Sequence, residues 1–81
     1  MNTQYYMTIE RNGKYGQWEP CKATTPTNAK REATKRYKGR NPNSRMVLAK
    51  PRYDIDIPWW IISSKINKSD GRWVDNTTLV E

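Results

Sequence analysis

Most of this chain follows the two-residue alternation that is typical of half-buried β-strands, and one short segment interrupts it with a helical pattern. Residues 4–11 open the alternation, with Tyr5, Met7 and Ile9 on one side and Tyr6, Thr8 and Glu10 on the other. A period of two places alternate side chains on opposite faces of a sheet. The first strand is therefore expected to bury one face against a core.

A hairpin is expected directly after this strand. Asn12 and Gly13 end the alternation, and Gly13 and Gly16 can supply positive-φ positions for a short loop around Lys14 and Tyr15. The chain can then return as a second strand over residues 17–24. Pro20 restricts that strand to an edge or to a bulge, because proline lacks the N–H that a ladder needs.

The helical segment is expected over Pro26–Lys38. Thr25 or Thr27 can cap the free N–H groups of the first turn, Pro26 fits that turn without losing a needed donor, and Gly39 ends the helix. A narrow stripe of mostly small residues recurs every four positions, at Ala29, Ala33 and Tyr37. Such a stripe lets a helix lie close to a sheet, with Arg31, Lys35 and Lys38 on the opposite side.

The second half returns to strand patterns. The sequence predicts a third strand over Arg45–Lys50 ended by Pro51, a linker over Pro51–Pro58, a strong strand over Trp59–Ile66, a turn over Asn67–Gly71, a short strand over Arg72–Asp75 and a frayed tail from Asn76. The order ββαβββ indicates an α+β fold in one domain, residues 1–81. We expect an antiparallel sheet of about five strands, covered on one face by a single α-helix.

Trp59, Trp60, Ile61 and Ile62 place apolar bulk on both faces of the fourth strand. The uncovered face then presents an aromatic patch. Three roles stay open for it: an interface with a partner, the plain back of a small sheet, or contact with a second copy.

The composition argues against an enzyme. The chain has no histidine, so a histidine triad is excluded, and its one cysteine, Cys21, can form no intramolecular disulfide. We expect Cys21 to be a small buried residue. Asp54, Asp56 and Lys65 could be imagined as a magnesium-dependent nuclease centre, but carboxylates in a charged linker are usually solvated or paired. We expect no catalytic residue, metal or cofactor.

Charge is the informative feature. The net charge is +7, and between Lys30 and Arg52 nine basic residues occur with the single acid Glu32. Arg31 and Lys35, like charges at i and i+4 of a helix, cost about a few tenths of a kcal/mol. The helix macrodipole by itself favours cations in the last turn, at Lys35, Arg36 and Lys38. The basic residues that the macrodipole does not account for favour binding to nucleic-acid phosphates or to an acidic protein surface.

Single-strand base stacking is the less favoured form of nucleic-acid binding, because it needs aromatic residues among the basic ones. Tyr37 belongs to the core stripe, and Trp59 and Trp60 lie elsewhere in the sequence.

Two segments carry a family resemblance. The run from Ala29 to Arg36 resembles the A-K-R-x-A-x-K-K helix of a small phage-borne anti-CRISPR protein that blocks the type I-F Csy (Cascade) surveillance complex. The stretch from Trp60 through Ser69-Asp70-Gly71-Arg72-Trp73-Val74-Asp75 is similar to that family's closing hairpin, with a D-G turn and a terminal R-W-V-acid strand. Together they span just under a third of the chain.

The resemblance implies a five-stranded antiparallel sheet with one helix, in a protein of the host bacterial cytoplasm. It also implies that basic residues dock on the backbone subunits of the complex and obstruct the path of target DNA. Carried over by position, these residues are Lys30, Arg31, Lys35 and Arg36, and more loosely Arg72. The helix-to-strand turn at Arg40–Ser44 is longer than in the family, and the Pro51–Pro58 segment is extra. Direct binding of double-stranded nucleic acid by the same cations is the alternative function.

Overall fold

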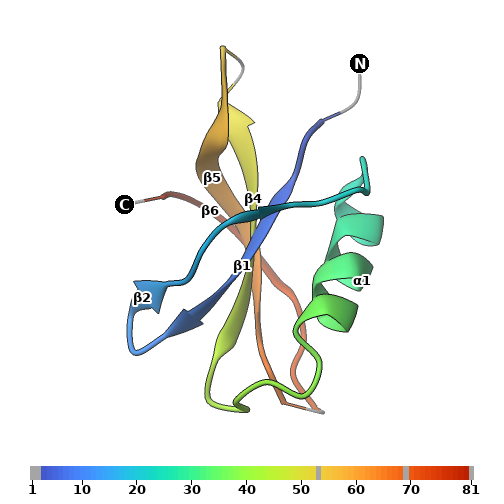
Figure 1. Cartoon of the computed structure of the whole chain (residues 1–81), viewed down its shortest axis with the longest axis vertical. Coiled ribbons are helices and arrows are strands. Elements are labelled where there is room, and N and C mark those ends of the chain that lie inside the picture. Colours follow the sequence, from blue (N-terminus) through green and yellow to red (C-terminus); the bar gives the residue numbers. More distant parts are fainter. Residues whose placement is uncertain (1–2, 53, 69, 81) are drawn as a thin grey trace.

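The structure is a computed structural model that describes residues 3–52, 54–68 and 70–80, and it places one helix beside one antiparallel sheet (Figure 1). Within these residues the elements are β1 (Tyr6–Arg11), β2 (Lys14–Tyr15), β3 (Glu19–Pro20), α1 (Pro26–Arg36), β4 (Arg45–Arg52), β5 (Ile55–Ile66) and β6 (Val74–Leu79). The predicted α+β class is confirmed. The described sheet has six strands where about five were expected, because two strands of two residues each, β2 and β3, occur where the sequence predicts a single longer strand.

The strands follow the spatial order β2-β1-β4-β5-β6, and β3 also pairs with β1. Cross-strand partners share a face of a sheet, so the register separates two rows. Met7, Leu48 and Ser63 lie on the face that α1 covers, called here the covered face. Thr8, Val47 and Ser64 lie on the opposite face, called here the open face.

Helix α1 begins as the sequence predicts and ends earlier. Thr25 is the N-cap, its Oγ1 accepts a hydrogen bond from the Asn28 N–H at 3.3 Å, and Pro26 opens the first turn. The helix ends at Arg36 rather than Lys38, because Tyr37 leaves the helical conformation at φ −107° and ψ 9°. Gly39, at φ 84°, then turns the chain toward β4. No helix among the described residues is long and apolar enough to cross a membrane.

The core lies between α1 and the covered face. Ala29 and Ala33 are fully buried, and Tyr37 is 3% exposed, as the stripe predicted. The buried cluster consists of Tyr5, Met7, Cys21, Ala29, Ala33, Tyr37, Met46 and Leu48. Alanine side chains allow the helix axis to approach the sheet closely, so the larger side chains of the strands fill the space between the two layers.

The second strand predicted over residues 17–24 is confirmed only at Glu19–Pro20, where β3 pairs with β1 at the edge expected for Pro20. Asn12 and Gly13 both have positive φ (54° and 78°) and form a two-residue turn, so Lys14 and Tyr15 already pair with β1 instead of forming the loop. Gly16 does not have the positive φ expected for it. The chain then runs along the edge of β1, where the Thr8 hydroxyl donates to the Gln17 carbonyl at 3.0 Å.

The proposed linker over Pro51–Pro58 is wrong, because β4 continues to Arg52 and β5 begins at Ile55. Pro51 and Pro58 face each other across the ladder, and the register shifts on either side of Pro51. These irregular positions tolerate residues that lack an N–H donor. The Tyr6 hydroxyl, 2.9 Å from both the backbone and a side-chain oxygen of Asp56, ties this hairpin to β1.

The C-terminal tail is ordered as a strand rather than frayed. Residues 74–79 pair with β5 as β6, and the Val80 N–H donates to the Trp59 carbonyl at 2.9 Å. The register of β4 against β5 shifts at Ile62, which is the extra residue of a bulge. Ile61 is therefore buried on the open face while Ile62 packs against the core.

The N-cap offers a direct test of the helix start. Thr25→Ala removes the oxygen that accepts the Asn28 N–H and is expected to lower the free energy of unfolding by about 1 kcal/mol. Thr27→Ala is the matched control, since Thr27 is exposed and its hydroxyl makes no hydrogen bond within the described residues. Urea denaturation followed by circular dichroism measures both. Equal stability of the two variants would contradict the assignment of Thr25 as the cap.

Candidate interaction surfaces

Two cations of α1 extend into solvent, Arg31 in the middle of the helix and Lys35 in its last turn. Both side chains are exposed, on the flank of the helix that faces away from the sheet, as predicted. Within the described part of the chain neither makes a hydrogen bond or ion pair, although they stand one turn apart with the same charge. This pair, called here the free pair, is able to form new contacts with an acidic partner without breaking existing ones.

Lys30 forms an ion pair within the fold and is not free to bind a partner. Its Nζ lies 2.8 Å from Asp75 Oδ1 on β6, and its side chain is only 23% exposed. The same Asp75 oxygen accepts a hydrogen bond from the Ser63 hydroxyl at 2.8 Å. Hydrogen bonds from Lys30 and Ser63 hold the pKa of the Asp75 carboxyl below its usual range. Lys30 thus ties the helix to the far strand of the sheet.

Arg36 also forms an ion pair within the fold. Its guanidinium lies 3.0 Å from Glu19 Oε1 and stands 5.6 Å from the centre of the Tyr37 ring. The Tyr37 hydroxyl donates to the other Glu19 oxygen at 2.8 Å. This hydrogen bond, followed by Arg36, holds the pKa of Glu19 below its usual value, while burial and then Glu19 raise the pKa of Tyr37. Together these contacts tie the C-terminal turn of α1 to β3.

Glu32 joins the helix to the chain before it, a role that the count of charges does not predict. Its carboxylate accepts hydrogen bonds from the backbone N–H of Lys22 at 2.9 and 3.0 Å and of Ala23 at 2.9 Å. The contact joins α1 to the connection that precedes it. No periodic or composition signal reveals such a contact, because it pairs a side chain with the backbone of an irregular segment.

Arg72 lies apart from the free pair, in the β5–β6 loop at one end of the sheet. The end of β1, the start of β4 and the end of β5 meet at this end, because Glu10, Arg45 and Ile66 are cross-strand neighbours. The C-terminal turn of α1 is joined to it, since the Asn67 side-chain amide donates to the Tyr37 carbonyl at 3.1 Å. We call this region the loop end.

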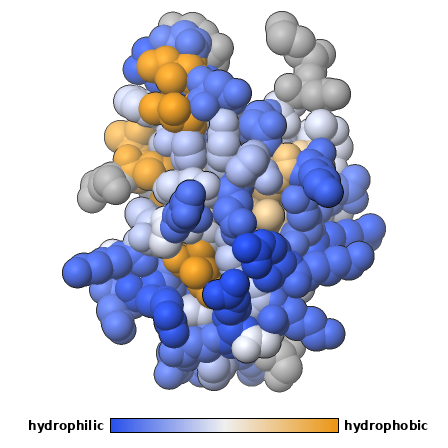
Figure 2. Space-filling view, in the orientation of Figure 1, coloured by the Kyte–Doolittle hydropathy of each residue, from blue (hydrophilic) through white to orange (hydrophobic). Residues whose placement is uncertain are grey.

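The loop end gathers much of the positive charge. Its exposed cations are Arg11, Lys14, Lys38, Arg40, Arg45, Lys68 and Arg72. The acids on the same segments are Glu10, which lies 3.9 Å from Arg45, and Asp70. In Figure 2 the lower part of the molecule, where the loop end lies, is mainly hydrophilic, whereas hydrophobic colour marks the β4–β5 hairpin, where Ile55 and Ile57 are exposed. Only folding brings these cations together, from three separate loops.

The residues considered for catalysis do not form a site. Arg52 forms an ion pair with Asp54, and Tyr6 donates to Asp56. Lys65 pairs with Met46, toward the opposite end of β5. Within the described residues, no group of three or more potential metal ligands occurs. Cys21 is buried, as expected, and burial raises the pKa of its thiol to about 12, so it stays protonated and unreactive at neutral pH.

The sequence reasoning missed a groove on the open face. It is lined by Gly13, Lys14, Tyr15, Trp18, Thr78 and Leu79 and has a volume of about 630 Å³. The sequence did not indicate Tyr15 and Trp18 as groove residues, because Trp18 was predicted to lie in a longer strand and Tyr15 in a loop.

Comparisons with protein-family models, with curated proteins and with solved structures found no match to the chain.

The contacts of Glu19 predict how stability depends on acid. Folding lowers the pKa of Glu19, so its carboxylate stabilises the fold above the ordinary pKa of 4.5, and this contribution is lost as the pH falls through the folded value. Glu19→Gln should therefore be less stable than the parent at neutral pH and should lose less stability on acidification. Urea denaturation over a pH series down to about 3 measures this.

Asp70→Asn is the matched control, because Asp70 is an exposed carboxylate outside the Glu19 cluster. It should follow the parent over the same pH series. An equal response of the two variants to acid would contradict a stabilising role for ionised Glu19.

Proposed function

We propose that this chain is a non-catalytic inhibitor from a phage or mobile element that binds a host CRISPR surveillance complex of the Cascade type and blocks target DNA. The free pair Arg31 and Lys35 on α1 is the contact that we assign to the backbone subunits of that complex. The identity of the target rests on the resemblance of the helix and closing-hairpin motifs. The binding mode rests on the charge of the helix flank.

One observation carries the binding mode. Arg31 and Lys35 are exposed and unpaired within the described residues, whereas the acids nearest to α1 are engaged: Glu19 by Arg36 and Tyr37, Glu32 by backbone N–H groups, and Asp75 by Lys30. The repulsion between two unpaired like charges on adjacent turns is relieved by an acidic partner. Charge complementarity of this kind speeds association and selects the partner.

Lys30 and Arg36 contribute in a different way from the free pair. Their ion pairs with Asp75 and Glu19 hold α1 against both edges of the sheet. A helix held in this way presents Arg31 and Lys35 in one orientation, which lowers the entropy lost on binding. We therefore assign Lys30 and Arg36 to the positioning of the contact surface, while Arg72 belongs to the loop end.

Charge reversal tests the helix contact. The double variant Arg31→Glu/Lys35→Glu should lose binding to an immobilised Cascade-type complex by a factor of about ten or more, since like charges placed opposite each other in an interface cost about several kcal/mol. The control Lys14→Glu/Lys50→Glu makes the same change in net charge at exposed positions off the helix and should bind like the parent. If both double variants lose binding equally, net charge rather than the helix flank governs the interaction.

Direct binding of double-stranded nucleic acid is the second candidate, and the cations of the loop end favour it. Seven exposed Lys and Arg on adjoining loops can neutralise several phosphates without reading bases. Gel shifts with duplex DNA at low and near-physiological salt separate the two functions. Tight duplex binding by the isolated protein, lost on Arg40→Glu/Lys68→Glu but kept on Arg31→Glu/Lys35→Glu, would support this second function. It would count against the inhibitor.

A further inference from the structure

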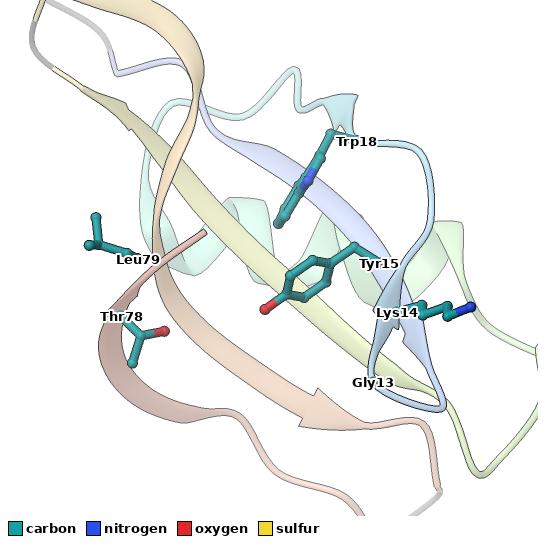
Figure 3. A pocket seen from close by; sticks show the side chains of 6 residues that line it. All are labelled: Gly13, Lys14, Tyr15, Trp18, Thr78 and Leu79. Atoms are coloured by element: carbon teal, nitrogen blue, oxygen red, sulfur yellow. The ribbon is translucent and has the colours of Figure 1, made fainter. Parts of the chain in front are cut away.

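The open face of the sheet carries a groove with aromatic walls on one side. Tyr15 and Trp18 come from the segment that runs along the edge of β1, and their ring centres are 5.6 Å apart with an angle of 44° between the planes. In Figure 3 the two rings extend over β4 toward Thr78 on β6, the Leu79 side chain points away from them, and α1 lies behind the sheet. Helix and groove are thus on opposite faces.

Folding does not close this groove. Thr8 and Val47 on the open face are almost fully buried, so the sheet beneath the rings is already shielded from water. Thr78 on the opposite wall nevertheless remains exposed, and the Tyr15 and Trp18 rings are only half-buried. Aromatic side chains that stay in contact with water along a groove are available to a ligand.

The groove continues into the basic loop end. Gly13 lines both the aromatic groove and a second hollow, of about 380 Å³, whose lining includes Asn12, Arg45 and Lys68. Lys14 sits on the rim between them, with its side chain directed away from the rings (Figure 3). Glu10 also lines the second hollow and lies 3.9 Å from Arg45, whereas Lys14 and Lys68 form no ion pair within the described residues. The combined lining is cationic.

We propose that this open-face groove binds single-stranded nucleic acid, with a base stacked against Trp18 and Tyr15 and the adjoining phosphates held by Lys14, Arg45 and Lys68. The proposal concerns the face opposite the free pair and goes beyond the inhibitor function. DNA and RNA share the chemistry that it uses, namely a flat base followed by a phosphate.

Single strands fit this lining better than two other classes of ligand. Every unpaired base offers a face to an aromatic ring, and an adjoining basic path holds the backbone, which is the usual combination in sequence-tolerant single-strand binders. A duplex keeps its bases stacked on each other, so it gives Trp18 and Tyr15 nothing to stack against. An extended peptide would gain apolar contact there, but only an acidic one would also pair with Lys14, Arg45 and Lys68.

The test uses labelled oligothymidine and oligouridine of about sixteen nucleotides, within the range of known single-strand sites, with a duplex of equal length as competitor. Fluorescence anisotropy of the label gives Kd, and quenching of tryptophan emission reports stacking. The parent should bind at least one single strand with quenching, and the duplex should compete poorly. Trp18→Leu keeps an apolar cover over the sheet and should weaken binding about tenfold, with most of the quenching lost.

A matched pair of charge variants tests the groove without touching the rings. Thr78→Glu places a carboxylate on the opposite wall, because Thr78 pairs with Ile61 of the open face, and it should weaken binding, whereas Ile57→Glu, at another exposed position on the β4–β5 hairpin, should bind like the parent. Unchanged Kd for Trp18→Leu, no binding of either single strand, or equal competition by the duplex would each overturn the proposal.

The helix variants keep this result separate from the proposed function. Arg31→Glu/Lys35→Glu should retain single-strand binding and quenching while losing the surveillance complex. Thr78→Glu should do the reverse, whereas Trp18 also lines a hollow beside Lys35 and is the less separate position. Loss of single-strand binding in the helix variant alone would assign the strand to α1 and overturn the groove.

Discussion

The close seating of α1 on the sheet is the contact on which the rest of this structure depends. Ala29 and Ala33 are fully buried against the covered face, where Met7 and Leu48 fill the space beneath them. Side chains this small bring the helix near enough for its flanks to reach neighbouring segments. Lys30 can then contact β6, and Glu32 can accept hydrogen bonds from the chain that enters the helix.

A strongly basic chain must limit its own charge repulsion, and this one uses its acids for that purpose. Glu19 and Asp75 come from different segments and pair with Arg36 and Lys30 on α1, whereas Glu32, on the helix itself, accepts hydrogen bonds from the backbone of the connection before it. Exposed ion pairs contribute little stability one by one. These pairs also have a geometric effect, because those of Lys30 and Arg36 hold the helix at both edges of the sheet and leave Arg31 and Lys35 as the cations of α1 without an ion pair among the described residues.

The two faces of the sheet are completed by different means. The helix closes one face with a packed core, whereas the other is shielded by Tyr15 and Trp18 from a short edge segment. Edge segments of two residues per strand cannot cover a sheet fully, so a groove stays open between these rings and β6. The fold therefore presents a charged helix flank on one side and an aromatic groove on the other, with a shared basic end.

The sequence by itself determined the α+β class, the position and N-cap of the helix, and the buried stripe at Ala29, Ala33 and Tyr37, because these follow from local periodicity and capping. It did not determine the pairing of strands through Pro51 and Pro58, since tolerance of proline depends on the register of the partner strand. The tertiary structure alone decided which cations are free, because the partners of Lys30 and Arg36 lie 45 and 17 residues away in the chain. It also decided the groove and the loop end, which join side chains from segments that no local pattern connects.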